Sequence, residues 1–190
     1  MQAAFTLVAS AQSSTEDVIF GMTFSGREAP VRDILNIPGV TLFTVPIRTR
    51  ISRSATLHTL YSTIRQNHID VAAHGSIGLP AIRKASPDAA RATDLRTVFA
   101  VQPRHVDPPE SVFGERLSFK EEMGRLPLIF EAWLVKGGVD LVVEYNTSSL
   151  GREEVEALVG RYVGVLEQLI SLPFEALVED VSVGMDASVA

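Results

Sequence analysis

The chain contains no cysteine. Disulfide bonds, zinc sites built on thiolates and a cysteine nucleophile are therefore excluded together. Positive charge is also scarce, because 17 Lys and Arg residues stand against 23 Asp and Glu residues and leave a net charge of -6. Nucleic-acid binding depends on a surplus of Lys and Arg, so we expect no nucleic-acid partner.

Long apolar runs are missing as well. A membrane helix needs roughly 18 or more apolar residues in succession, and no stretch of this sequence reaches that length. The first residues lack the basic flank and apolar core of a secretion signal. We therefore expect a cytoplasmic chain with no membrane partner.

The motifs of several common catalytic sites are absent. The sequence has no P-loop, no G-x-G-x-x-G after a strand and no G-x-S-x-G elbow. None of its four histidines lies at metal-ligand spacing from another His or Glu: His58, His68, His74 and His105. We expect no metal site and no catalytic residue in this chain. Structural or solvated roles are expected for three of the histidines, and His74, before the Gly-rich "GSIG", is the one candidate for a cleft.

What the sequence does contain is enough apolar material for a core. It has 190 residues, of which 46% are hydrophobic, and no internal repeat or low-complexity linker divides it. The length and composition predict a single α/β or α+β lobe over residues 1–190. The apolar, Ala-rich first eleven residues predict a helix that begins without a cap, as in a segment of a longer chain.

Two strands are predicted early in the chain, "DVIFGMTF" from Asp17 and "LFTVPIRTRI" from Leu42, by their β-branched and aromatic content. Alternation in the second strand places Thr44, Arg48 and Arg50 on one face and Phe43, Val45, Ile47 and Ile51 on the other. Pro46 has no N–H for a ladder hydrogen bond. It therefore predicts an edge strand or a bulge.

Further elements follow in alternation. A helix is predicted from Ser54 to about Asn67, with Ser52 or Ser54 as its cap and with His68 and Asp70 just beyond it. "SIGLPAIRK" indicates at most a short helical turn, and a buried strand begins at Asp94.

The second half contains the clearest local signals. "LIFEAWLV" and "VDLVVEYN" flank Lys136-Gly137-Gly138 and predict a β-hairpin. Gly151 with Glu154 predicts the start of a helix that ends near Leu172. Its expected sheet-facing stripe is Val155, Leu158, Val159, Tyr162, Val163, Leu166, Leu169 and Ile170. The Pro-rich and charged segment 104–127 predicts a long surface excursion, and "ALVEDVSV" predicts a last short strand.

The order of these motifs resembles a known family. "EDVIFGMTFSGREAP" followed by "IPGVTLFTVPIRTRI" is similar to the second half of nonribosomal peptide synthetase condensation domains, where V-F-G-x-T-x-S-G-R precedes G-P-x-x-N-T-x-P-x-R. "GLPAIRK", "VFAVQP" and "VDLVVEYNTSSLGREEVEALVGRYVGVLEQLI" resemble fungal members in the same order. The resemblance covers nearly the whole chain.

The resemblance implies a chloramphenicol-acetyltransferase-like lobe, in which a mixed β-sheet is packed with helices. Condensation domains pair two such lobes around a tunnel. Donor and acceptor peptidyl carrier proteins insert phosphopantetheine arms there, and an acyl or peptidyl thioester is joined to an amine. The family's catalytic H-H-x-x-x-D-G motif lies in the first lobe, and this sequence has no His-His pair. The resemblance thus implies the C-terminal lobe alone, with the N-terminal lobe as partner and no bound cofactor.

The matching residues are expected to line the substrate tunnel or the contact between lobes. They are Ser25, Gly26, Arg27, Thr44, Pro46 and Arg48, with His74 added as a cleft candidate. Gly26 permits a tight turn, and Arg27 offers its donors either across the lobe contact or to an ion pair that anchors its own loop. Phe43 stands where the family usually has Asn, which is the main departure from the pattern.

Three alternatives remain open from the sequence. A related fold can serve as a non-catalytic docking module for carrier proteins. The lobe can also come from an epimerisation domain or from a terminal cyclising domain. The presence of an H-H-x-x-x-D-G motif encoded immediately upstream would distinguish a lobe of a catalytic domain from a non-catalytic docking module.

Overall fold

The computed structural model describes residues 1–28, 31–102 and 126–184 of the chain. Its helices and strands follow one another in the order α1 (Gln2–Ser13), β1 (Asp17–Phe24), β2 (Phe43–Arg50), α2 (Leu57–His74), α3 (Leu79–Ala85), α4 (Pro87–Ala92), β3 (Thr97–Gln102), β4 (Leu128–Val135), β5 (Gly138–Tyr145) and α5 (Arg152–Ser171). Short 3₁₀ turns lie at η1 (Ile34–Asn36), η2 (Gly75–Ile77) and η3 (Val178–Asp180). The predicted N-terminal helix is confirmed as α1.

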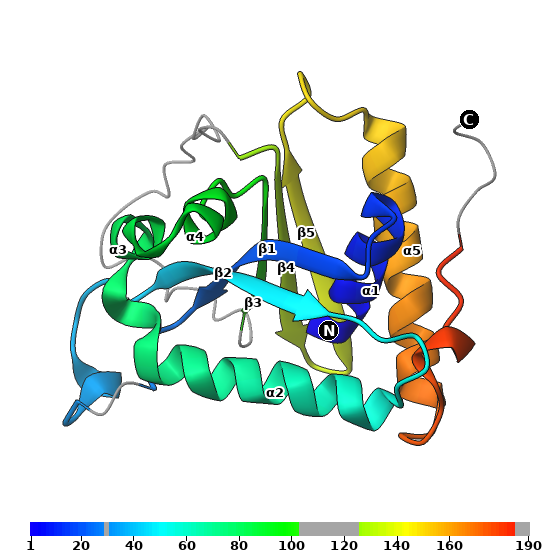
Figure 1. The fold of residues 1–190 in the computed structure, drawn as a ribbon, viewed down its shortest axis with the longest axis horizontal. Coiled ribbons are helices and arrows are strands. Elements are labelled where there is room, and N and C mark those ends of the chain that lie inside the picture. The colour runs from blue at the N-terminus through cyan, green and yellow to red at the C-terminus, as the bar shows by residue number, and fades with distance from the viewer. Residues whose placement is uncertain (29–30, 103–125, 185–190) are drawn as a thin grey trace.

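The strands form one mixed sheet in the order β2-β1-β3-β4-β5 (Figure 1). The β1–β2 and β4–β5 pairs are antiparallel, and β1–β3 and β3–β4 are parallel. Because β2 is an end strand of this sheet, Pro46 lies at an edge as predicted. The β4–β5 hairpin is also confirmed, and Gly137 in its turn has a φ of 88°, which a residue without a Cβ adopts at little cost.

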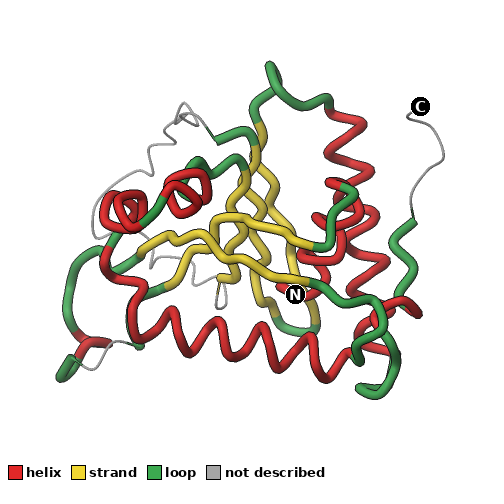
Figure 2. Tube along the Cα trace, in the orientation of Figure 1, coloured by secondary structure: helices red, strands yellow, loops and turns green. Residues whose placement is uncertain are grey.

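An aromatic cluster joins the helices to the sheet. The Phe5 ring of α1 lies 5.0 Å from the Phe20 ring, 4.7 Å from that of Phe99 and 5.4 Å from that of Phe130. Tyr162 of α5 adds a ring 4.7 Å from Phe130 and is fully buried. Figure 2 shows the strands in the centre with helices around them. The core is therefore built between the sheet and the α1–α5 pair, where burial of large aromatic side chains stabilises the fold most.

Several predicted boundaries are wrong. α2 is capped by Thr56, whose Oγ1 accepts from the Thr59 N–H at 3.2 Å, and it runs on to His74. His68 and Asp70 therefore lie inside the helix, and not beyond it. The segment predicted as a short turn contains α3, and α4 follows directly with Ser86 as its cap.

The C-terminal part shows two more differences. α5 begins as predicted, with the Gly151 N–H donating to Glu154 Oε2 at 2.7 Å. However, Val163 and Ile170 of its expected sheet-facing stripe are exposed, and Val165 is buried in their place. "ALVEDVSV" holds the 3₁₀ turn η3 and a single bridge to Thr56, and is not a strand. Most of the predicted excursion 104–127 lies outside the described residues.

Within the described ranges, no helix combines the length and apolar character needed to span a membrane.

Candidate functional site

The turn after β1 carries the first predicted site residues. Gly26 has a φ of 67°, and a Cβ placed on it would collide with the backbone carbonyl oxygen of Thr41. Thr41 Oγ1 donates to the Ser25 carbonyl at 2.7 Å, and the Arg27 N–H donates to Ser25 Oγ at 3.3 Å. Glycine is therefore required at position 26 by both conformation and space.

Arg27 holds the loop that follows this turn. Its Nη1 donates to the carbonyls of Ile34 and Ile37 at 2.5 and 2.7 Å, and its Nη2 donates to that of Gly39 at 2.9 Å. The planar guanidinium suits this task because it presents several donors in a fixed fork. Arg27 therefore anchors its own loop, which is one of the two roles expected for it. It does so through hydrogen bonds to carbonyl oxygens and not through an ion pair.

The same loop exposes large apolar side chains. Val40 is 90% exposed and Leu35 is 78% exposed. The other exposed apolar residues of the segment are Val31, Ile37 and Leu42, and Ile77 of η2 is also exposed. In Figure 1 this loop, drawn in light blue, projects from one end of the molecule. We call the five exposed apolar residues of the loop the apolar loop surface: Val31, Leu35, Ile37, Val40 and Leu42. Exposed apolar patches of this kind mark interaction sites.

The edge strand β2 presents a polar row beside the loop. Thr44 lies opposite Thr23 in the β1–β2 register, and their hydroxyl oxygens are 2.9 Å apart. Pro46 lies opposite Gly21 on the same face. The predicted alternation of β2 is confirmed, since Val45 and Ile47 are buried whereas Arg48 and Arg50 are exposed.

Arg48 is engaged by a carboxylate that the sequence did not indicate. Its Nε and Nη2 donate to the two carboxylate oxygens of Asp17 at 2.7 and 2.5 Å, and Arg50 approaches the same carboxylate at 3.5 Å. The hydrogen bonds from Arg48 lower the pKa of Asp17 to about 2. Arg48 thus presents a fixed, partly neutralised surface, because an ion pair at bidentate geometry restricts the guanidinium.

Phe43 points to the opposite face from Thr44 and Arg48. Its ring stacks on Phe24 at 5.5 Å, and it covers Gly75 just beyond α2. Phe43, which replaces the family's usual Asn, is therefore packed against Phe24 and against Gly75 at the end of α2. His74, the last residue of α2, is exposed, and within the described segments its side chain makes no hydrogen bond or ion pair.

His68 is the histidine with the strongest packing. Its Nε2 is hydrogen bonded to Gln2 Oε1, and its ring lies edge-on to Phe24 at 5.4 Å. Burial lowers the pKa of His68, whereas the charge of Glu28 acts in the opposite direction. The link joins α2 to α1, so it is a tertiary contact and not the local one expected from the sequence. No group of acidic or histidine side chains suited to a metal occurs in the described part.

The sequence matches the model of the condensation domain family over residues 1–185. It is 30% identical over 172 residues to the nonribosomal peptide synthetase TES of Alternaria alternata, covering 89% of this chain and 3% of that protein. It is 31% identical over 174 residues to the synthetase inpB of Emericella nidulans, covering 89% and 7%. The chain therefore spans a few per cent of the length of these fungal relatives.

Solved structures give the same fold. The first condensation domain of the CDA synthetase matches with a TM-score of 0.70 at 13% identity, over 97% of this chain and 41% of that one. The starter condensation domain of rhizomide synthetase RzmA matches with a TM-score of 0.68 at 16% identity, over 97% and 43%. The predicted chloramphenicol-acetyltransferase-like fold, a mixed sheet packed with helices, is confirmed by these matches.

Proposed function

The chain belongs to the condensation domain family of nonribosomal peptide synthetases, and from that premise we propose that it is the C-terminal lobe of such a domain. In this proposal it forms one wall of the tunnel in which a carrier-bound thioester is transferred to an acceptor amine. The extent of the structural matches supports the assignment, because they cover 97% of this chain but only 41–43% of the solved condensation chains.

The reaction requires a group that this lobe does not supply. The amine nitrogen attacks the thioester carbonyl, a C–N bond forms, the C–S bond breaks, and the thiol leaves with the proton that the amine gives up. In the family the group that positions the amine lies in an H-H-x-x-x-D-G motif, and the sequence has no His-His pair. The isolated lobe is therefore not competent in this proposal.

The observation that carries the proposal is the apolar loop surface. Val40 and Leu35 are held out to solvent by a loop whose carbonyls are fixed by Arg27. A rigid apolar surface loses little conformational entropy when it is covered. We propose that the N-terminal lobe packs on this surface, and that Ser25, Gly26 and Arg27 shape the contact between the two lobes.

The polar row of β2 is assigned to the tunnel wall. Thr44, Pro46 and Arg48 share one face, and the Thr23 hydroxyl and the Asp17 carboxylate fix two of them. His74 is assigned to the tunnel mouth. Donor and acceptor peptidyl carrier proteins deliver the thioester and the amine on their phosphopantetheine arms, so the chain itself needs no bound cofactor.

Surface variants in the joined two-lobe domain test the lobe contact. Val40→Asp places a charge on the apolar loop surface, and Ile170→Asp is a matched control because Ile170 is 77% exposed on α5, away from the loop. Peptide formation from loaded carrier proteins should fall at least about tenfold in Val40→Asp, because an apolar contact then buries a charge. The control should retain its rate.

Equal rates in the two variants would contradict the assignment of the loop to the lobe contact. If the unaltered two-lobe domain makes no product but retains carrier binding, the docking-module alternative is supported. Epimerised or cyclised product would identify the other two alternatives.

A further inference from the structure

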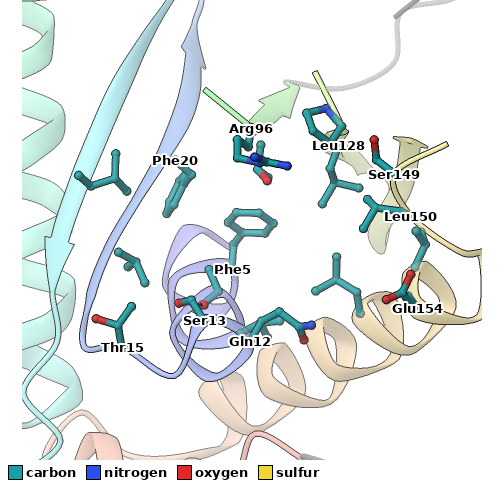
Figure 3. A pocket seen from close by; sticks show the side chains of 18 of the residues that line it. Phe5, Gln12, Ser13, Thr15, Phe20, Arg96, Leu128, Ser149, Leu150 and Glu154 are labelled. Carbon is teal, nitrogen blue, oxygen red and sulfur yellow. Dashed lines mark hydrogen bonds between the residues drawn. The ribbon is translucent and has the colours of Figure 1, made fainter. Parts of the chain in front are cut away.

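A second feature lies at the far end of the sheet from the apolar loop surface. A pocket of about 440 Å³ opens where β1, β3 and β4 begin, and α1 and the start of α5 close it (Figure 3). The loop follows Phe24 at the other end of β1. The pocket is therefore separate from the apolar loop surface, whereas its lining residue Asp17 also binds Arg48 of β2.

The pocket floor is apolar. It is formed by side chains from two helices and two strands, namely Phe5, Val8, Phe20, Leu128, Val155 and Leu158. All but Leu158 are buried in the protein, so the floor is preformed. Ligand sites of this size are mostly apolar with a few polar groups that orient the ligand.

Three charged side chains lie at the rim: Asp17, Glu154 and Arg96. The Asp17 carboxylate is bound by Arg48 and Arg50. One oxygen of Glu154 accepts from the Gly151 N–H at 2.7 Å. The Arg96 side chain, in contrast, makes no hydrogen bond or ion pair with the described residues. In Figure 3 it lies between Phe20 and Leu128, across the pocket from Gln12. Within the described part of the chain, Arg96 is therefore the charged rim side chain whose hydrogen-bond donors are free, and Glu154 keeps its negative charge.

From this combination we propose that the pocket binds a small amphiphile with an apolar body and a carboxylate head, such as a medium-chain fatty acid. The hydrocarbon body lies on the apolar floor, and the Arg96 guanidinium donates to the carboxylate at the rim. Arginine suits this contact because its planar fork matches a carboxylate. Neither the apolar floor nor Arg96 is among the residues assigned to the tunnel or to the lobe contact, so the proposal does not rest on the proposed function.

Methyl NMR of the protein with octanoate and with octan-1-ol separates the two parts of this proposal. Octanoate should shift the methyl signals of Val8, Leu128 and Leu158, and the alcohol should shift the same signals more weakly. Arg96→Gln should weaken octanoate binding about fivefold, the loss expected for one exposed ion pair, and leave alcohol binding unchanged. Arg83→Gln on α3, also exposed, should change neither affinity.

The pocket itself is tested by Ser149→Trp at its exposed rim, which should block both compounds by filling the mouth. The proposal is overturned if octanoate leaves the floor methyls unshifted up to its solubility limit. Shifts spread over the whole surface, or equal octanoate affinity in Arg96→Gln and the unaltered protein, would also overturn it.

Discussion

Phe43 covers Gly75 so closely that a Cβ placed on Gly75 would collide with Phe43 Cε2, and it would also lie 2.9 Å from Val71 Cγ1. Gly75 has a φ of -65°, which any residue adopts, so glycine is favoured there by space and not by backbone conformation. The residue that departs from the family pattern is thus matched by a small residue 32 positions later in the chain.

Gly75→Ala should therefore destabilise the protein by about 1–3 kcal/mol, the usual cost of overpacking a filled site. In a Phe43→Ala background the same change should cost less, because only the Val71 contact remains. Urea unfolding of the four members of this double-mutant cycle measures the coupling. Gly160→Ala is the control, since nothing lies within 4 Å of its Cβ position in α5. It should stabilise the protein by about 0.5–1 kcal/mol. Additive costs at positions 43 and 75 would contradict the packing account.

Alanine substitutions at Gly26 and Gly137 distinguish the cost of a strained backbone conformation from the cost of steric crowding. Both have positive φ, but only Gly26 faces a backbone carbonyl, and nothing lies within 4 Å of the Cβ position of Gly137. Gly137→Ala should cost about 1–2 kcal/mol of stability from the left-handed conformation alone. Gly26→Ala should cost at least about 1 kcal/mol more, because the turn must also move away from Thr41. Equal costs in urea unfolding would show that the Thr41 contact is relieved easily.

Arg27→Lys tests whether geometry or charge holds the loop. A lysine keeps the positive charge but cannot bridge three carbonyls with a fixed fork. Amide exchange at Asn36 and Ile37 should therefore accelerate about tenfold or more in both Arg27→Lys and Arg27→Ala. Exchange in the β4–β5 hairpin serves as the internal reference. Near-normal protection in the lysine variant would indicate that charge alone is sufficient.

The Asp17–Arg48 pair should make stability depend on acid pH. The folded-state pKa of Asp17 is lowered from 3.8 to about 2 by the hydrogen bonds from Arg48. The contribution of this carboxylate is thus fully present above about pH 4 and is lost as pH falls toward 2. Asp17→Asn should flatten the stability profile in this window. An Asp17 carboxyl that titrates near 3.8 in an NMR titration would refute the pairing.

The sequence predicted those parts of the fold that depend on local signals. The Lys136-Gly137-Gly138 turn, the Gly151–Glu154 cap and Pro46 on an edge strand each have a local physical cause, and all three are confirmed. The end of α2 was missed because the pattern of Leu57, Leu60 and Ile64 fades after Asn67, where the helix face is largely exposed. The contact of His68 with Gln2 fixes that part of the helix through tertiary structure.

The sequence proposed residues for the candidate site, but it did not indicate the partners that these residues have in the structure. Asp17 and Arg48 are 31 residues apart and meet only through the β1–β2 register. Arg27 anchors its own loop, as one of its two expected roles had it, but through carbonyls that become available only when η1 and its flanks fold back. Such partners depend on three-dimensional closure, which periodicity and spacing do not encode. The contact of Arg27 across the lobe interface stays a prediction.

The most direct test of the central claim compares this chain alone with the same chain joined to its upstream lobe. Both are supplied with donor and acceptor carrier proteins loaded with aminoacyl groups, and product on the acceptor carrier is followed by intact mass. We predict dipeptidyl product with the joined lobes and none above the carrier-only background with this chain alone. Turnover by the isolated chain at a rate comparable to that of the joined lobes would contradict the account.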